Sequence, residues 1–208
     1  MTAVKICGIK TPEEVSILNR YTPDYAGFIF SRSKRIVSIK KASFLIGLLP
    51  KEVKRVGVFV NETEETILNT QWECGLDVIQ LSGDEDESFI NKLKKTGYIK
   101  EIWKSVRVSG STDYSDINNN ADAILLDTYS KSAYGGTGET FDWNGAKSFA
   151  ENHRIILAGG LNPDNVKEAI KTLNPYCVDV SSGVEVNGYK DENLVKEFIK
   201  RVKSGVNV

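Results

Sequence analysis

The chain has 208 residues, a formal net charge of −1 and 40% hydrophobic residues, with charged residues at 26%. This composition is typical of one globular domain that can bury a core without disulfides or metal ions, and it excludes a disordered chain. The near-zero charge argues against a protein that holds a nucleic-acid backbone, and no apolar run approaches the ~18 residues that span a bilayer.

Eight short apolar segments are spread almost evenly along the chain, and they are too short for helices. Most of them are rich in Val, Ile and Phe, which favours strands. We predict strands, in chain order, at Val4–Cys7, Ala26–Phe30, Arg55–Val60, Asp77–Leu81, Ile99–Lys104, Ala121–Leu126, Arg154–Ala158 and Cys177–Val180.

The stretches between these strands carry helix signals. Thr11 and Glu14 form a capping box, with Pro12 at the first helical position. Asn162 is predicted to cap a later helix, whose apolar stripe is Val166, Ala169, Ile170 and Leu173. A last helix has one apolar face, formed by Leu194, Val195, Phe198, Ile199 and Val202. The helix predicted within Ser109–Asn120 has the weakest signal, because that segment is polar.

Strands that alternate with helices across short links predict parallel βαβ units. Eight such units in an unbroken series predict an α/β fold, a (β/α)₈ barrel of the TIM type, with residues 1–208 forming a single domain. The alternative is an open doubly wound sheet, which usually has five or six strands and a glycine-rich turn after the first. Here the first strand runs into Gly8 without a GxGxxG motif.

Few side chains are available for metal binding or nucleophilic catalysis. His153 is the single histidine, which excludes a multi-histidine metal site and leaves one candidate base for a Ser-His-Asp or Cys-His arrangement. Cys7, Cys74 and Cys177 form no CxxC pair, and scattered free thiols suit a reducing compartment. Residues 1–8 lack the shape of a signal peptide, so we expect a cytoplasmic protein.

In a barrel of this type the chemistry takes place at the carboxyl ends of the strands. Alternation along the first strand places Lys5 and Cys7 on the face toward the barrel interior. Cys7 is either a small buried apolar residue or a thiolate base whose pKa the Lys5 ammonium lowers. Asp127 ends the sixth strand, where it either caps the next segment or acts as a general acid with a raised pKa.

Three loops have features that suit an anionic ligand. Residues 31–35 contain three cations, which form either a solvated surface or an arginine fork for a carboxylate or phosphate. The loops after the seventh and eighth strands hold Gly159, Gly160, Ser181, Ser182 and Gly183. These two loops are the frequent phosphate site of such barrels, so we predict a phosphate site rather than two plain turns.

The connection Thr128–Phe141 is long and contains four residues of sequence GGTG at 135–138. Long loops in compact domains tend to be lids or binding loops, and the alternative is a surface excursion. It is not a P-loop, because no Gly-Lys-Ser/Thr follows. This connection is thus the place to look for a lid.

In order and spacing, the motifs of this chain resemble the phosphoribosylanthranilate isomerase family over essentially the whole length. They are KICGI at 5–9, SKR at 33–35, VGVFVN at 56–61, QLSG at 80–83, LLDT at 125–128, GGTG at 135–138, FDW at 141–143, GGLNP at 159–163 and VDVSSGVE at 178–185. The family commonly has QLHG where this chain has Ser82, so a histidine near the substrate is missing.

The resemblance implies an Amadori rearrangement in tryptophan biosynthesis, without metal or organic cofactor. N-(5′-phosphoribosyl)anthranilate becomes 1-(o-carboxyphenylamino)-1-deoxyribulose 5-phosphate. Cys7 is then the general base, Asp127 the general acid, and Arg35 the partner of the anthranilate carboxylate. The glycines after the seventh and eighth strands hold the phosphate, and Asp179 supports substrate binding or the electrostatics of the site.

Other phosphate-binding barrels are the rival interpretations. A metal-dependent pentose-phosphate epimerase would need several histidines, and the related isomerase of histidine biosynthesis would have aspartate in place of Cys7. A barrel that binds a sugar phosphate without turnover would not need Cys7, Asp127 and Arg35 together. We expect a phosphorylated small molecule as ligand, no nucleic acid, no membrane, and a monomer, with a homodimer as the alternative.

Overall fold

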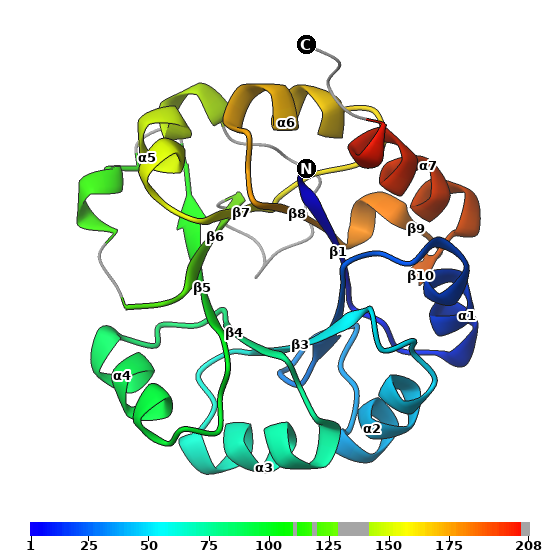
Figure 1. The fold of residues 1–208 in the computed structure, drawn as a ribbon, viewed down its shortest axis with the longest axis vertical. Helices are drawn as coiled ribbons and strands as arrows, with labels where there is room; N and C mark the ends of the chain where they lie inside the picture. Colours follow the sequence, from blue (N-terminus) through cyan, green and yellow to red (C-terminus); the bar gives the residue numbers. More distant parts are fainter. Residues whose placement is uncertain (110–111, 118–119, 129–141, 205–208) are drawn as a thin grey trace.

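The computed structural model describes residues 1–109, 112–117, 120–128 and 142–204 (Figure 1). Eight parallel strands pair in sequence order, and the eighth pairs with the first, so the sheet closes into a barrel. The strands are β1 (Ala3–Cys7), β2 (Tyr25–Ile29), β3 (Lys54–Phe59), β4 (Val78–Leu81), β5 (Ile102–Val108), β6 (Ala123–Thr128), β7 (Ile155–Leu157) and β8 (Cys177–Val180). The predicted barrel is confirmed, and the open sheet is wrong.

Helices surround the barrel as an outer ring (Figure 1). In the described part of the chain the α-helices are α1 (Pro12–Tyr21), α2 (Ile39–Gly47), α3 (Glu64–Cys74), α4 (Glu87–Lys95), α5 (Lys147–Asn152), α6 (Val166–Leu173) and α7 (Glu192–Lys203). The same described residues also form three short 3₁₀ helices, which are η1 (Tyr114–Asp116), η2 (Trp143–Ala146) and η3 (Ser182–Val184). A hairpin of β9 (Glu185–Val186) and β10 (Tyr189–Lys190) follows β8.

The helix predicted within Ser109–Asn120 is wrong. The described residues of this segment form only η1. Asp113 caps η1, because its carboxylate accepts hydrogen bonds from the backbone N–H and the hydroxyl of Ser115. A polar segment offers few apolar side chains to pack against the barrel, and packing is what stabilises most short helices.

The predicted capping box on α1 is confirmed, since Thr11 accepts from the Glu14 N–H and the Glu14 carboxylate accepts from the Thr11 N–H. The cap predicted at Asn162 differs in the structure. Asn162 Oδ1 accepts from the N–H groups of Asp164 and Asn165, at 2.8 and 3.2 Å, so it closes a turn before α6. The helix itself begins at Val166, because that turn takes up the first residues after the cap.

The barrel interior is filled by an apolar cluster that includes Tyr25, Val56, Val78, Trp103, Ala123, Leu125, Ile156, Ala158 and Cys177. Tyr25 and Trp103 meet edge to face, with ring centroids 4.9 Å apart. A larger cluster packs between strands and helices. Apolar side chains fill much of the interior, and the polar side chains of the pocket described below lie toward the carboxyl ends of the strands.

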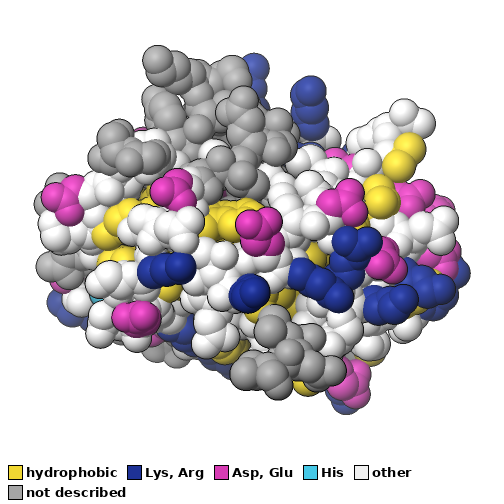
Figure 2. Space-filling model, turned by 90° about the horizontal axis from the view of Figure 1, so that it is seen from above, with side chains coloured by type: hydrophobic (Ala, Val, Ile, Leu, Met, Phe, Trp, Pro, Cys, Tyr) yellow, Lys and Arg dark blue, Asp and Glu magenta, His cyan; other side chains and the backbone are white. Residues whose placement is uncertain are grey.

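The outer surface mixes charges of both signs, as Figure 2 shows for one side of the molecule. This agrees with a chain that has 27 basic and 28 acidic residues. No helix in the described ranges is long and apolar enough to cross a membrane.

Candidate active site

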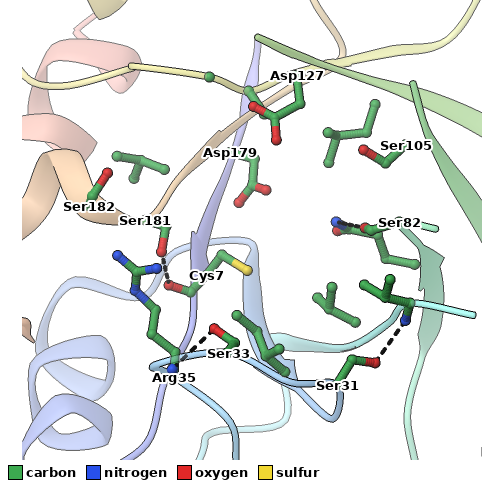
Figure 3. A pocket seen from close by; sticks show the side chains of 18 of the residues that line it. Cys7, Ser31, Ser33, Arg35, Ser82, Ser105, Asp127, Asp179, Ser181 and Ser182 are labelled. Carbon is green, nitrogen blue, oxygen red and sulfur yellow. Dashed lines mark hydrogen bonds between the residues drawn. The ribbon is translucent and has the colours of Figure 1, made fainter. Parts of the chain in front are cut away.

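A pocket opens at the carboxyl ends of the barrel strands (Figure 3). It brings together nearly all of the side chains and glycines predicted from the sequence, from five different strand ends. Those lining the pocket are Cys7, Arg35, Asp127, Gly159, Gly160, Asp179, Ser181 and Ser182. Gly183 does not line it. A side chain at Gly183 would clash with the carbonyl oxygen of Leu161, so this glycine allows the last two loops to pack together.

A buried ion pair lies at the centre of the site. Lys5 on β1 is directly opposite Asp179 on β8 in the strand register, and its Nζ lies 2.8 Å from Asp179 Oδ2. The Lys5 side chain is fully buried. Burial by itself would lower the pKa of Lys5, but the charges of Asp179 and Cys7 outweigh it and raise that pKa above the ordinary value. Lys5 is therefore a permanent cation beneath the pocket.

Cys7 lies two residues further along β1, with its thiol toward the cavity (Figure 3). It is 6% exposed, and burial raises the pKa of its thiol above the ordinary value. Lys5 acts in the opposite direction, while Asp179 adds to the rise. Lys5 thus acts on the thiol pKa in the predicted direction, but burial of the thiol exceeds the effect of the ammonium and leaves that pKa raised.

Asp127 stands near the carboxyl end of β6 and points into the same cavity. Burial and the neighbouring charge of Asp179 raise the pKa of its carboxyl to about 6, although the Thr128 N–H, Lys5 and Arg107 act against the shift. This agrees with the predicted environment of a general acid. Near neutral pH such a group both holds and releases a proton, which is what a proton donor needs.

Arg35 is held at the pocket wall by an acidic residue that sequence reasoning missed. Its Nε and Nη2 donate to the two carboxylate oxygens of Glu185, both at 2.7 Å. Lys190 donates to Glu185 Oε1 at 2.6 Å. Burial would raise the pKa of Glu185, but Arg35 and Lys190 outweigh it and lower that pKa to about 2. Glu185 belongs to the VDVSSGVE motif, yet nothing local in the sequence connects it with Arg35, 150 positions away.

The two phosphate-type loops lie side by side at the pocket. Gly159 and Gly160 have φ values of +83° and +64°, a region that favours glycine. A Cβ at Gly159 would also come within 2.5 Å of the Thr128 backbone nitrogen. Ser181 donates to the carbonyl of Cys7 at 3.0 Å, which joins the last loop to β1. Gly159, Gly160, Ser181 and Ser182 thus line the pocket from two adjacent loops.

The opposite wall was predicted only at Ser82, the position that the family resemblance places near the substrate. It contains Gln80 and Ser82, joined by a 3.0 Å hydrogen bond, together with Ser105 and Arg107 on β5. The predicted strand ended at Lys104, but β5 continues to Val108 and pairs Arg107 with Asp127 in register. Side chains alternate between the two faces of a strand, so the inward Trp103 could have predicted that Ser105 and Arg107 also point inward.

The expected lid, Thr128–Phe141, falls outside the described residues except for Thr128. Among the described residues, no group of three or more His, Cys, Asp or Glu side chains is arranged to hold a metal ion.

Comparisons with known proteins agree on one family. The model of the family described as N-(5′-phosphoribosyl)anthranilate (PRA) isomerase matches residues 4–201. A protein of that name from a Thermoanaerobacter species (strain X514) is 46% identical over 204 residues, which cover 98% of each chain. Another, from Acetivibrio thermocellus, is 47% identical over 210 residues, covering 98% of this chain and 96% of the relative.

Solved structures give the same answer. The crystal structure of phosphoribosyl anthranilate isomerase from Thermotoga maritima has a TM-score of 0.89 at 38% identity and covers 99% of this chain and 100% of that one. A phosphoribosyl anthranilate isomerase in complex with reduced 1-(o-carboxyphenylamino)-1-deoxyribulose 5-phosphate has a TM-score of 0.85 at 37% identity, with coverage of 99% and 100%. This chain belongs to the N-(5′-phosphoribosyl)anthranilate isomerase family.

Proposed function

We propose that this chain catalyses the Amadori rearrangement of N-(5′-phosphoribosyl)anthranilate with Asp127 as general acid and Cys7 as general base. The observation that carries the proposal is the pair itself: a carboxyl with a pKa of about 6 and a buried thiol face one cavity from β6 and β1. The reaction needs only proton transfers between fixed positions, which suits a pocket with these two groups.

In the first step Asp127 donates its proton to the furanose ring oxygen. The C1′–O bond breaks, the ring opens, and the nitrogen lone pair forms the iminium ion. The raised pKa of Asp127 supports this role, because the folded site keeps the carboxyl protonated to higher pH than water does. Asp127 is left as a carboxylate.

In the second step the Cys7 thiolate removes the proton from C2′, and the electron pair of that C–H bond neutralises the iminium. The resulting enolamine tautomerises to the ketone. Catalysis therefore begins with a proton on Asp127 and none on Cys7, which is the minor arrangement in the unliganded protein because burial favours the thiol. The Lys5 ammonium and the positive iminium both favour the thiolate when substrate is bound.

The remaining groups bind the two anionic ends of the substrate. Arg35 holds the anthranilate carboxylate, and the loops of Gly159–Gly160 and Ser181–Gly183 hold the phosphate. Asp179 keeps the Lys5 ammonium beside Cys7, since its Oδ2 accepts from Lys5 Nζ at 2.8 Å. Support for the phosphate assignment comes from the position of these loops after the seventh and eighth strands of a barrel.

We propose further that the chain acts in the cytoplasm as a single domain over residues 1–208. One related crystal structure is described as that of monomers of the dimeric phosphoribosylanthranilate isomerase from Thermotoga maritima. That description favours testing the homodimer against the monomer expected from the sequence. Light scattering coupled to gel filtration distinguishes a mass of 23.1 kDa from twice that value.

The decisive experiment follows the loss of phosphoribosylanthranilate fluorescence with the wild type, Cys7→Ala and Asp127→Ala. A positioned acid or base typically contributes about 10²–10⁴-fold, so each variant should lose turnover by that order. Unchanged turnover in either variant would refute its assigned role. Binding of substrate without turnover in the wild type would instead favour a sugar-phosphate-binding barrel without catalysis.

A further inference from the structure

The arginine assigned to the substrate carboxylate already has a carboxylate partner. Glu185 accepts from both Nε and Nη2 of Arg35, so taken alone the two side chains form a neutral pair. Among the described residues, none accepts a hydrogen bond from Nη1, which leaves that amino group for a ligand. A neutral pair, however, attracts an anion far less than a free guanidinium does.

A second cation restores the charge. The Lys190 side chain is fully buried, and its Nζ donates to Glu185 Oε1 at 2.6 Å and to the Ser181 carbonyl at 3.0 Å. Two cations therefore share one carboxylate. The three side chains of Arg35, Glu185 and Lys190, which we call the charge triad, carry a net charge of +1.

The local fold holds Lys190 in this place. The hairpin turn at Asn187 and Gly188, with φ values of 53° and 80°, pairs Lys190 on β10 directly opposite Glu185 on β9. The Lys190 backbone N–H also donates to Glu14 Oε1 at 3.1 Å, which joins the hairpin to the start of α1. Burial lowers the pKa of Lys190 even though Glu185 acts against the shift, so the charged form is costly to keep here and its presence calls for a role.

We propose that Lys190 supplies the net positive charge with which Arg35 binds the substrate carboxylate, while Glu185 fixes the orientation of the guanidinium. Both are positioning residues, since they act through Arg35. This role rests on the proposed function, because the carboxylate is that of the anthranilate group. The alternative is that the charge triad only fastens the hairpin to the barrel.

Lys190→Met removes the charge and keeps the length of the side chain. We expect at least a tenfold rise in KM for phosphoribosylanthranilate and an equal rise in Kd for the reduced product analogue, with kcat within about threefold of the wild type. An otherwise identical analogue that lacks the ring carboxylate should bind the wild type and Lys190→Met equally. Lys190→Gln, which keeps a donor for the Ser181 carbonyl, should behave like Lys190→Met.

Lys104→Met is the matched control. Lys104 is another buried lysine, and its Nζ likewise contacts a carboxylate, Glu85 at 3.2 Å, and a backbone carbonyl, that of Gly83 at 2.6 Å. Its removal should lower stability without changing the discrimination between the two analogues. Urea unfolding of each variant verifies that the binding experiments use folded protein.

The double variant Lys190→Met/Glu185→Gln distinguishes the effect of the net charge from the effect of attaching the hairpin to the barrel. It returns the triad to a net charge of +1, because Arg35 keeps its charge and the carboxylate at position 185 is replaced by a neutral amide whose oxygen still accepts from Arg35. KM should therefore recover to within about threefold of the wild type. A double variant no better than Lys190→Met, or an equal loss of affinity for both analogues, would overturn the proposal. Failure of wild-type turnover would refute the proposed function instead.

Discussion

Asp127→Asn tests the environment of the acid, because the same burial that raises the carboxyl pKa also weakens the fold. The pKa of Asp127 is raised from 3.8 to about 6, chiefly by burial and by Asp179. Between these values the folded protein holds the proton and the unfolded chain has lost it. The free energy of unfolding therefore falls as the pH rises through this window, and the loss is complete above about pH 6.

The magnitude follows from the shift. About two pH units at about 1.4 kcal/mol each gives about 3 kcal/mol as an upper value. Because Asp127 opens onto the cavity, solvent screening reduces it, and we expect about 1–2 kcal/mol. Asparagine carries no charge, so Asp127→Asn should be more stable than the wild type by that amount at pH 8. The difference should shrink as the pH is lowered toward 4, and turnover should fall by about 10²–10⁴-fold.

The assay is urea unfolding between pH 4 and 8, followed by tryptophan fluorescence, to which the buried Trp103 contributes, with turnover measured on the same samples. Asp122→Asn is the control, since Asp122 lies just before β6 but accepts from the Ile102 N–H and from Lys94. That control should gain no stability at pH 8. If Asp127→Asn gains none there either, the carboxylate is not destabilised by its surroundings, and its pKa is not raised.

Three further outcomes are expected. Lys5→Met leaves Asp179 buried without its ion pair and should lower the free energy of unfolding by about 3–5 kcal/mol. The double variant Lys5→Met/Asp179→Asn should recover most of that loss. An equal loss of stability in both variants would contradict the pairing. Gly27→Ala places a Cβ 2.8 Å from Cys7 Sγ and 3.2 Å from Lys5 Cε. It should lower kcat, and it should lower the free energy of unfolding in urea by about 1–3 kcal/mol. A variant with the kcat of the wild type would show that the thiol tolerates displacement. Because burial raises the pKa of the Cys7 thiol, iodoacetamide should alkylate Cys7 slowly at pH 7 and faster as the pH rises. Mass spectrometry measures the rate of alkylation. A rate at pH 7 equal to that of free cysteine would contradict this prediction.

The strand order could be read from the sequence because each strand is a short apolar segment that faces either the barrel interior or the helices. The same signal failed at the end of β5. There the inward residues are Ser105 and Arg107, which line the pocket and are polar, so the hydrophobic pattern ends while the pairing with β6 continues to Val108. A strand end that forms part of a polar site is hidden from hydrophobic periodicity for this reason.

The sequence by itself determined the order of the strands and which residues stand at their carboxyl ends, because local patterns and chain order specify both. Only the tertiary structure decided the chemical state of those residues. Cys7 has a raised rather than a lowered thiol pKa because burial outweighs the neighbouring Lys5. Arg35 is tied to Glu185 because the barrel brings together residues 150 positions apart. Burial and long-range pairing set protonation and charge, and neither is encoded in any one segment of the chain.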